Sequence, residues 1–222
     1  DVINLWKETD VRNTPTLVVS YGGLSGEYWW YARDNVWEDK KLNRFFPRET
    51  LDARSLRRET APDWDYYHIE VARAAKALRD AGVKITVGGH GQLQGLSANW
   101  ETWSLTQGGF SNWQALRAAT IDGADLIGLS KQLGSLTPGK RADFVVLNSN
   151  PLEDIRATID TRYVAVNGRV FDVDADMAEV GGLGRKPPQF YWQQHRDGRS
   201  FGLEYGPTMP CHCPKSGLRH AH

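Results

Sequence analysis

The chain has 222 residues, of which 27 are Lys or Arg and 27 are Asp or Glu, so its formal net charge at pH 7 is zero. A neutral chain lacks the positive field that recruits nucleic acid or an anionic membrane, and we expect neither partner. No apolar run reaches the roughly 20 residues of a membrane-spanning helix, and the N-terminal segment lacks the basic-then-apolar order of a signal peptide.

The first elements are predicted to be a helix end, a strand and a long loop. Residues 2–8 have a helical pattern with Asp1 as N-cap, and Pro15 then blocks a helix before the β-branched residues 16–20, which predict a strand. Residues 24–65 are irregular, polar and rich in aromatic side chains. This stretch is far longer than an ordinary connection, which indicates a functional loop or an inserted lid.

A single strand–helix–strand unit is predicted, and the insertion lies between its first strand and its helix. Residues 66–81 form the clearest helical pattern, Gly82 stands where a left-handed C-cap is expected, and residues 83–87 predict a second strand. The two strands should be parallel, with a right-handed crossover. His68 would lie in the first helical turn and His90 just beyond the second strand, so both can open onto one face.

The remainder of the chain changes from helical to antiparallel strand patterns. Residues 98–107 predict a helix, and Ser111 with Gln114 forms a capping box that starts a helix to about residue 124. After a turn at 133–140, strands are predicted at 143–147, 162–166 and 169–171, the last two joined by the hairpin signal Asn167-Gly168. The fold class is therefore α/β, followed by a small antiparallel sheet.

His90 is the leading functional candidate because it follows the strand at 83–87 in the sequence VGGHGQLQG. The loop at the carboxyl end of a buried strand is free to present chemistry, which makes this histidine a candidate metal ligand or base. Gln92, Gln94 and Glu101 bring amide and carboxylate groups that can orient a ring nitrogen or a substrate carbonyl. The alternative is a histidine whose ring nitrogens are bound by loop backbone.

Two other clusters have open interpretations. The aromatic residues 28–31 could be a stacking platform for a ring-bearing substrate, or they could pin the long loop to its own domain. The segment Cys211-His212-Cys213, with His220 and His222, contains metal-binding side chains. Its spacing does not match a closed zinc site, which favours a tail or adventitious metal binding.

The segments GVKITVGGHGQLQGLSANWETWSLTQGG, SNWQALRAATIDGADLIGLSKQLGSLTPGKRADFVVLNSNPLEDI and RYVAVNGRVFD resemble the C-terminal part of the amidohydrolase superfamily. More narrowly, PTLVVSYGG, the aromatic insertion, HGQLQG and the CHC tail resemble imidazolonepropionase-like amidohydrolases that are often joined to a TolB-like propeller. The resemblance implies the last strands and helices of a TIM-like (β/α)8 barrel in residues 1–132, with the insertion at 24–65. It places a β-sandwich return segment at 133–172 and a Gly/Pro-rich tail at 173–222.

The same resemblance implies a metal-dependent hydrolase that cleaves carbon–nitrogen bonds other than peptide bonds in a small amide or cyclic amide. It implies a divalent metal, expected to be zinc, whose main ligands lie outside this chain. His90 stands where the superfamily's eighth strand usually supplies an Asp, so it would be metal ligand or base. The predicted site contains catalytic residues His90 and Glu101, the metal ligand His90, and substrate-binding residues Gln92, Gln94, His68 and Tyr21.

By this resemblance we expect a C-terminal fragment that is inactive alone and needs the N-terminal part of the same polypeptide, with a TolB-like propeller as a further partner. Such relatives are often exported from the bacterial cytoplasm. The alternative is a binding or scaffolding module that keeps the barrel without catalysis. The His at position 90 in place of Asp and the aromatic loop both favour that alternative.

Overall fold

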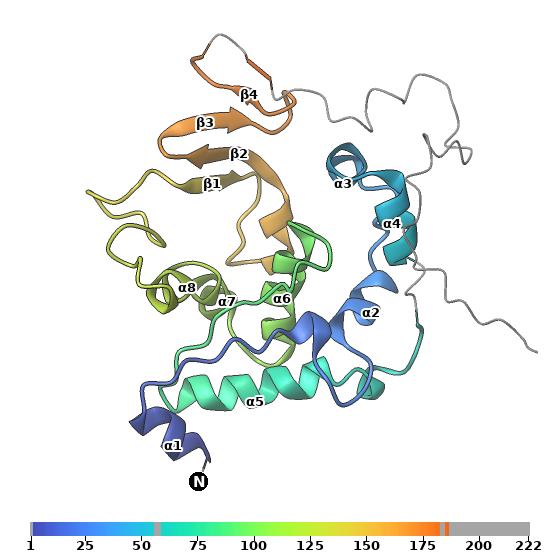
Figure 1. Ribbon diagram of the computed structural model, residues 1–222, viewed down its shortest axis with the longest axis vertical. Helices are drawn as coiled ribbons and strands as arrows, with labels where there is room; N and C mark the ends of the chain where they lie inside the picture. The colour runs from blue at the N-terminus through green and yellow to red at the C-terminus, as the bar shows by residue number, and fades with distance from the viewer. Residues whose placement is uncertain (1, 56–58, 183–184, 187–222) are drawn as a thin grey trace, which may run out of the picture. The chain divides into compact units, whose positions relative to one another are not determined.

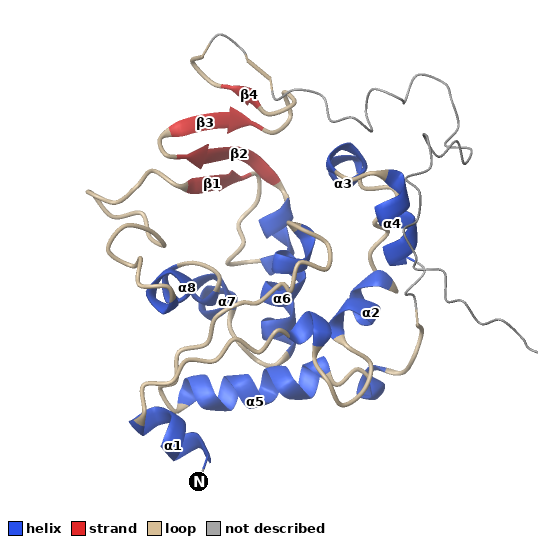
Figure 2. Cartoon of the chain, viewed as in Figure 1, coloured by secondary structure: helices blue, strands red, loops and turns tan. Residues whose placement is uncertain are grey.

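The computed structural model describes residues 2–55, 59–182 and 185–186 as a mixed helix and strand fold (Figures 1 and 2). In these residues the α-helices are α1 Val2–Glu8, α2 Gly26–Tyr31, α3 Lys40–Phe45, α4 Arg48–Ser55, α5 His68–Asp80, α6 Leu96–Gln107, α7 Asn112–Ala118 and α8 Ile121–Leu126. Short 3-10 helices occur at η1 Leu17–Val19, η2 Asp63–Asp65 and η3 Ile155–Ile159. The strands are β1 Phe144–Leu147, β2 Thr161–Val166, β3 Arg169–Asp172 and β4 Ala178–Glu179. No helix of the described residues is long and apolar enough to cross a membrane.

Helix α6 is the centre of the core. It contacts α5, α2, α7 and both 3-10 helices η1 and η3, and its residues from Trp100 to Leu105 are all buried. A helix that is buried on nearly every side needs partners around its whole circumference, and the neighbouring elements supply them. In Figure 1, α6 lies between α5 and the strands.

The strand predicted at 16–20 is wrong. Residues Leu17–Val19 form the 3-10 helix η1, preceded by Thr16 in the left-handed conformation with φ of 52° and ψ of 56°. The strand predicted at 83–87 is reduced to an isolated parallel bridge between Asn13 and Ile85. The parallel direction is therefore observed, but the partner of the 83–87 segment is Asn13 rather than the 16–20 segment.

The insertion at 24–65 is closed at its base and contains helices. A parallel bridge joins Leu24 to Tyr66, in which the Leu24 N–H donates to the Asp65 carbonyl at 3.0 Å and the Tyr67 N–H donates to the Leu24 carbonyl at 3.0 Å. Helices α2, α3 and α4 lie within it, so the expectation of an irregular loop is corrected. The bridge explains how a long segment can leave and rejoin the fold at one point.

The helical predictions after the insertion are largely confirmed. Helix α5 ends at Asp80, Gly82 follows its C-cap with a φ of 102°, and the Val83 N–H donates to the Leu78 carbonyl as in a Schellman motif. The capping box of Ser111 and Gln114 is present. The predicted helix to residue 124 is instead two helices, because Thr120 leaves helical geometry with φ of −129° and ψ of −95°.

The strands form one antiparallel sheet of order β1-β2-β3-β4. Val166 pairs with Arg169 around Asn167 and Gly168, whose φ values of 51° and 77° match the predicted two-residue turn. Three of these strands lie within one residue of their predicted bounds. The described residues contain this single sheet, so the second layer of a sandwich is not seen in them.

Candidate functional site

His90 lies on an exposed loop in a strained backbone conformation. Its side chain is exposed and its φ is 50°, in the left-handed region that residues other than Gly rarely adopt. Such outliers persist only where the surroundings impose them, and they gather at functional sites. The exposed ring is accessible to a ligand, as a metal ligand or base at this position would have to be.

Two glycines press the His90 loop against its neighbours. A Cβ on Gly88 would lie 2.7 Å from both Thr14 Cγ2 and Thr16 Oγ1. A Cβ on Gly89 would lie 3.0 Å from Ser97 Oγ, in the first turn of α6. The loop is thus held between the 14–16 segment and α6, and this packing fixes the backbone that leads into His90.

Glu101 ties the η1 segment to α6 from inside the core. Its side chain has no exposed surface, and its Oε1 and Oε2 accept hydrogen bonds from the backbone N–H groups of Leu17 at 2.9 Å and Val18 at 3.0 Å. Both oxygens are therefore occupied by the protein's own backbone. The carboxylate supplies the partners that a strand ladder would have given to these N–H groups.

Burial raises the pKa of Glu101 to about 7, because the low-dielectric core disfavours the charged carboxylate. The hydrogen bonds from the backbone N–H groups of Leu17 and Val18 oppose this rise. The buried carboxylate therefore holds the η1 segment against α6 while its own charge is disfavoured by the core.

His68 is fully buried rather than open to the face that presents His90. Its Nε2 lies 2.9 Å from Gln107 Oε1, at the end of α6, and its ring lies 6.1 Å from that of Trp29 and 6.3 Å from that of Tyr66. Its Nδ1 has no hydrogen-bond partner among the described residues. Burial lowers the pKa of His68 to about 4, so the ring is neutral at pH 7.

The other predicted substrate-binding residues differ in exposure. Tyr21 is 93% exposed, Gln94 is exposed and Gln92 is half-buried. Gln94 lines a pocket that also contains residues of α3 and of the sheet. The structure therefore leaves Tyr21 and Gln94 accessible to a ligand. Tyr21 follows the η1 segment, whose backbone is bonded to Glu101.

The aromatic residues of α2 pin the insertion to α6. Trp30 and Tyr31 are buried, and the Trp30 ring stacks on Trp100 at 6.3 Å while its Nε1 donates to Ser104 Oγ at 2.9 Å. The Tyr31 ring meets Trp100 edge-on at 5.0 Å. For these two residues the structure favours anchoring over a stacking platform.

Sequence reasoning missed Gln107 and Thr16. Gln107 is the hydrogen-bond partner of His68, but it is 39 residues away and nothing local indicates the contact. Thr16 adopts the left-handed conformation at the start of η1. A signal for close packing did exist at Gly88-Gly89, because paired glycines after a strand often mark close backbone approach.

The described residues do not fit a complete metal site. No three His, Cys, Asp or Glu residues among them come together in a group that could hold a metal ion. His68 is buried against Gln107, which leaves His90 as the accessible imidazole in this part of the chain. The cysteine and histidine residues of 211–222 lie outside the described residues.

Comparisons with known proteins give a family match. The profile of the amidohydrolase family matches residues 50–171. An S-triazine hydrolase of Gordonia rubripertincta is 42% identical over 67 residues, which are 25% of this chain and 14% of that protein. A 5-methylthioadenosine/S-adenosylhomocysteine deaminase of Teredinibacter turnerae is 54% identical over 39 residues, 18% of this chain and 9% of that protein.

Among solved structures, the fold is similar to that of a Xaa-Pro dipeptidase with bound methionine in the active site. The TM-score is 0.52 at 22% identity, over 77% of this chain and 36% of that chain. The chain thus spans about a third of the dipeptidase and smaller parts of the curated relatives that it matches.

Proposed function

Because this chain belongs to the amidohydrolase family, we propose that it forms part of a metal-dependent hydrolase that cleaves carbon–nitrogen bonds other than ordinary peptide bonds in small amides or cyclic amides. The relatives named as an S-triazine hydrolase and a deaminase support chemistry at carbon–nitrogen bonds. The observation that carries the proposal is His90, exposed and held in a left-handed conformation within the matched segment.

In this proposal His90 is the catalytic residue of the chain. A neutral imidazole can accept a proton at one ring nitrogen or donate a lone pair to a metal, and unlike the Asp expected at this place it adds no negative charge. The exposed Gln94 and the half-buried Gln92 would donate amide hydrogen bonds to the substrate carbonyl oxygen, and Tyr21 would contact the substrate from the η1 side.

Glu101 takes a positioning role in this proposal in place of the predicted catalytic one. Its two oxygens are bonded to the backbone of Leu17 and Val18, so it acts on the site through the segments that it holds. His68 likewise acts from the core, where it connects the start of α5 to the end of α6. Neither side chain has surface with which to touch a substrate.

We also propose that hydrolysis requires a bound metal ion. A divalent ion, expected to be zinc, would supply Lewis acidity toward the substrate carbonyl. His90 would give one ligand, and the described residues do not form the remainder of a site. The other ligands would come from the N-terminal part of the same polypeptide, which can also include a TolB-like propeller, and the 222 residues alone would hydrolyse no amide.

The test compares the purified 222-residue chain with the polypeptide translated from its complete open reading frame. Both are stripped of metal, reloaded with Zn²⁺ and assayed for amine release from linear and cyclic amides. We expect hydrolysis by the longer polypeptide, loss of activity on chelation and no activity of the shorter chain. A folded, metal-loaded longer polypeptide that hydrolyses none of them would refute the hydrolase and favour a binding module.

A further inference from the structure

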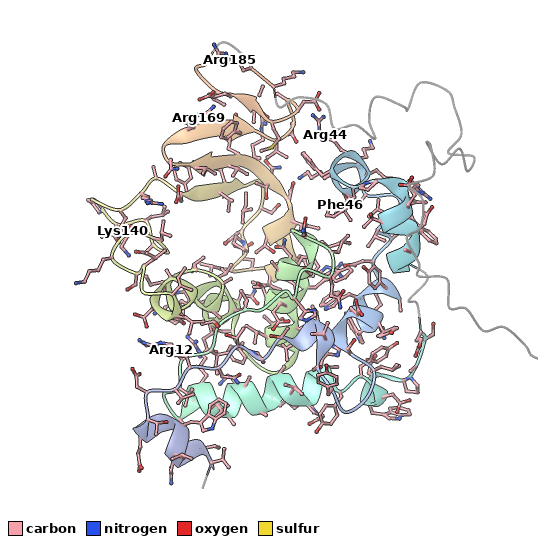
Figure 3. The ribbon with its side chains drawn as sticks, in the orientation of Figure 1. Arg12, Arg44, Phe46, Lys140, Arg169 and Arg185 are labelled. Carbon is pink, nitrogen blue, oxygen red and sulfur yellow. The ribbon has the colours of Figure 1, made fainter. Side chains whose placement is uncertain are left out.

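A pocket of about 520 Å³ lies between the insertion and the sheet. One wall is formed by α3 and the residue after it, including Leu42, Phe45 and Phe46, and another by residues of η3, β2 and the segment after β3, including Ile159 and Val164. The segment from Gln94 to Asn99, which follows the His90 loop, completes the lining. Figure 3 labels Arg44 and Phe46 at α3. A volume of this size is typical of a small-molecule site.

The walls are tied together by polar contacts at the rim. Arg44 of α3 forms an ion pair with Asp176, next to the pocket residue Met177. Lys41 Nζ donates to the carbonyl oxygens of Ile159 at 3.3 Å and Thr161 at 3.4 Å. These contacts join α3 to both η3 and the segment that follows β3, so the pocket has fixed walls on opposite sides.

The charged residues in the lining are already engaged by the protein. The Asp39 carboxylate accepts a hydrogen bond from the Leu42 N–H at 2.8 Å and caps α3, while Lys41 is bonded to two carbonyl oxygens. The other side chains of the lining are apolar or neutral. A charged ligand would lose hydration here without gaining an ionic partner, so the pocket selects a neutral and largely apolar group.

Two amides give the pocket its polar side. Asn99 Nδ2 donates to the Gly95 carbonyl at 2.9 Å, which fixes that amide. Gln94 is exposed and its side chain makes no hydrogen bond to another described residue. Gln94 lies four residues after His90 in the chain, so its amide is the lining residue nearest in sequence to the His90 loop.

We propose that this pocket binds the apolar substituent of a neutral amide substrate, an aliphatic chain or an aryl ring, while the amide carbonyl accepts a hydrogen bond from Gln94. This inference rests on the proposed function, since it names the substrate class of the same site. The α3 segment of the insertion is then a specificity element, because it supplies the apolar wall.

The experiment measures binding without requiring turnover. The 222-residue chain is titrated with acetanilide, butyranilide and hexananilide, and with adipic acid monoanilide as the charged comparator of equal chain length, while amide resonances are followed by NMR. We expect the affinity to rise about fourfold for each CH₂ added, from roughly 0.8 kcal/mol per buried CH₂. The terminal carboxylate should remove this gain, and the shifted resonances should include the side-chain amide of Gln94.

Matched variants locate the site. Val164→Trp fills the pocket from β2 and should abolish binding of hexananilide, whereas Val166→Trp, at an exposed position of the same strand outside the lining, should leave it unchanged. Gln94→Ala should lower the affinity roughly fivefold, the usual effect of one lost hydrogen bond. This variant changes a loop side chain and tests the idea even if Val164→Trp fails to fold.

Affinities that do not depend on chain length, equal binding of the charged anilide, or full binding by both Val164→Trp and Gln94→Ala would overturn the proposal. An absence of binding by every anilide would do so as well. Chain-length-dependent binding, with no hydrolysis by the complete polypeptide, would support the pocket and refute only the hydrolase.

Discussion

Glu101 and His68 are two buried titratable groups whose effects on stability oppose each other, and single substitutions should separate them. Burial raises the pKa of Glu101 from 4.5 to about 7 and lowers the pKa of His68 from 6.5 to about 4. The perturbations are Glu101→Gln and His68→Gln, which remove each titration while keeping a similar shape and a hydrogen-bonding amide.

The signs follow from proton linkage. Glu101 has a raised pKa in the folded protein, so its contribution to stability is full below pH 4.5 and is lost as the pH rises through 7. His68 has a lowered pKa, so its contribution is full above pH 6.5 and is lost as the pH falls toward 4. When the pH falls from 8 to 5.5, Glu101 therefore raises the free energy of unfolding by about 2 kcal/mol, and His68 lowers it by about 1.4 kcal/mol.

The assay is urea unfolding at pH 8 and pH 5.5, followed by tryptophan fluorescence. The native chain should change its free energy of unfolding by less than about 1 kcal/mol over this range, because the two terms nearly cancel. Glu101→Gln should be less stable at pH 5.5 than at pH 8, because only the His68 effect remains. His68→Gln should be more stable at pH 5.5 than at pH 8, because only the Glu101 effect remains. If both variants keep the native pH dependence, these groups are not buried as described and the reasoning is refuted.

Three further substitutions, with Gly123→Ala as a control, test the packing around His90 by chemical denaturation. Glu101→Ala should destabilise the chain by about 2–6 kcal/mol, because it leaves two buried N–H groups of η1 without acceptors. A loss below about 1 kcal/mol would contradict the role of Glu101 in holding η1. Gly88→Ala should destabilise the chain by about 1–3 kcal/mol, because the new Cβ would lie 2.7 Å from Thr14 Cγ2. The control Gly123→Ala, in α8, should be neutral or stabilising by up to ~1 kcal/mol. Equal effects of the two substitutions would argue against the close approach at Gly88. His90→Gly should stabilise the chain by up to ~1 kcal/mol through relief of its positive φ, and a marked loss would mean that the ring is a packing element.

Local sequence signals predicted the elements that local hydrogen bonds define. Gly82 ends α5, Ser111 and Gln114 cap α7, and Asn167-Gly168 turns β2 into β3, each as the residue type requires. In all three cases the contacts that decide the structure lie within a few residues. The pattern of the sequence contains the information needed for them.

The η1 segment could not be predicted in this way. Its β-branched residues favour a strand, but its N–H groups are bound by Glu101, which is 84 residues from Leu17. Glu101 itself stands in a helix as an ordinary charged residue, and only the fold shows that it lies on a buried side of α6. Tertiary contacts therefore overrode local propensity at the place that flanks the candidate site.

The insertion contained a signal that the aromatic composition obscured. Asp39 caps α3 through the Leu42 N–H, three residues later, which is an N-cap arrangement that sequence can indicate. The catalytic role of His90 stays a prediction, whereas the predicted opening of His68 onto the same face is wrong, because its burial depends on Gln107 and on rings such as Trp29 of the insertion. No local pattern reports such contacts.

The most direct test of the central proposal is the turnover of His90→Ala in the complete, metal-loaded polypeptide, measured beside its unfolding midpoint. Removal of a catalytic imidazole should lower turnover at least about 100-fold. The midpoint should not fall, since the side chain is exposed and its backbone already carries strain. Undiminished turnover, or a fall explained by an equal loss of folded protein, would contradict a catalytic role for His90.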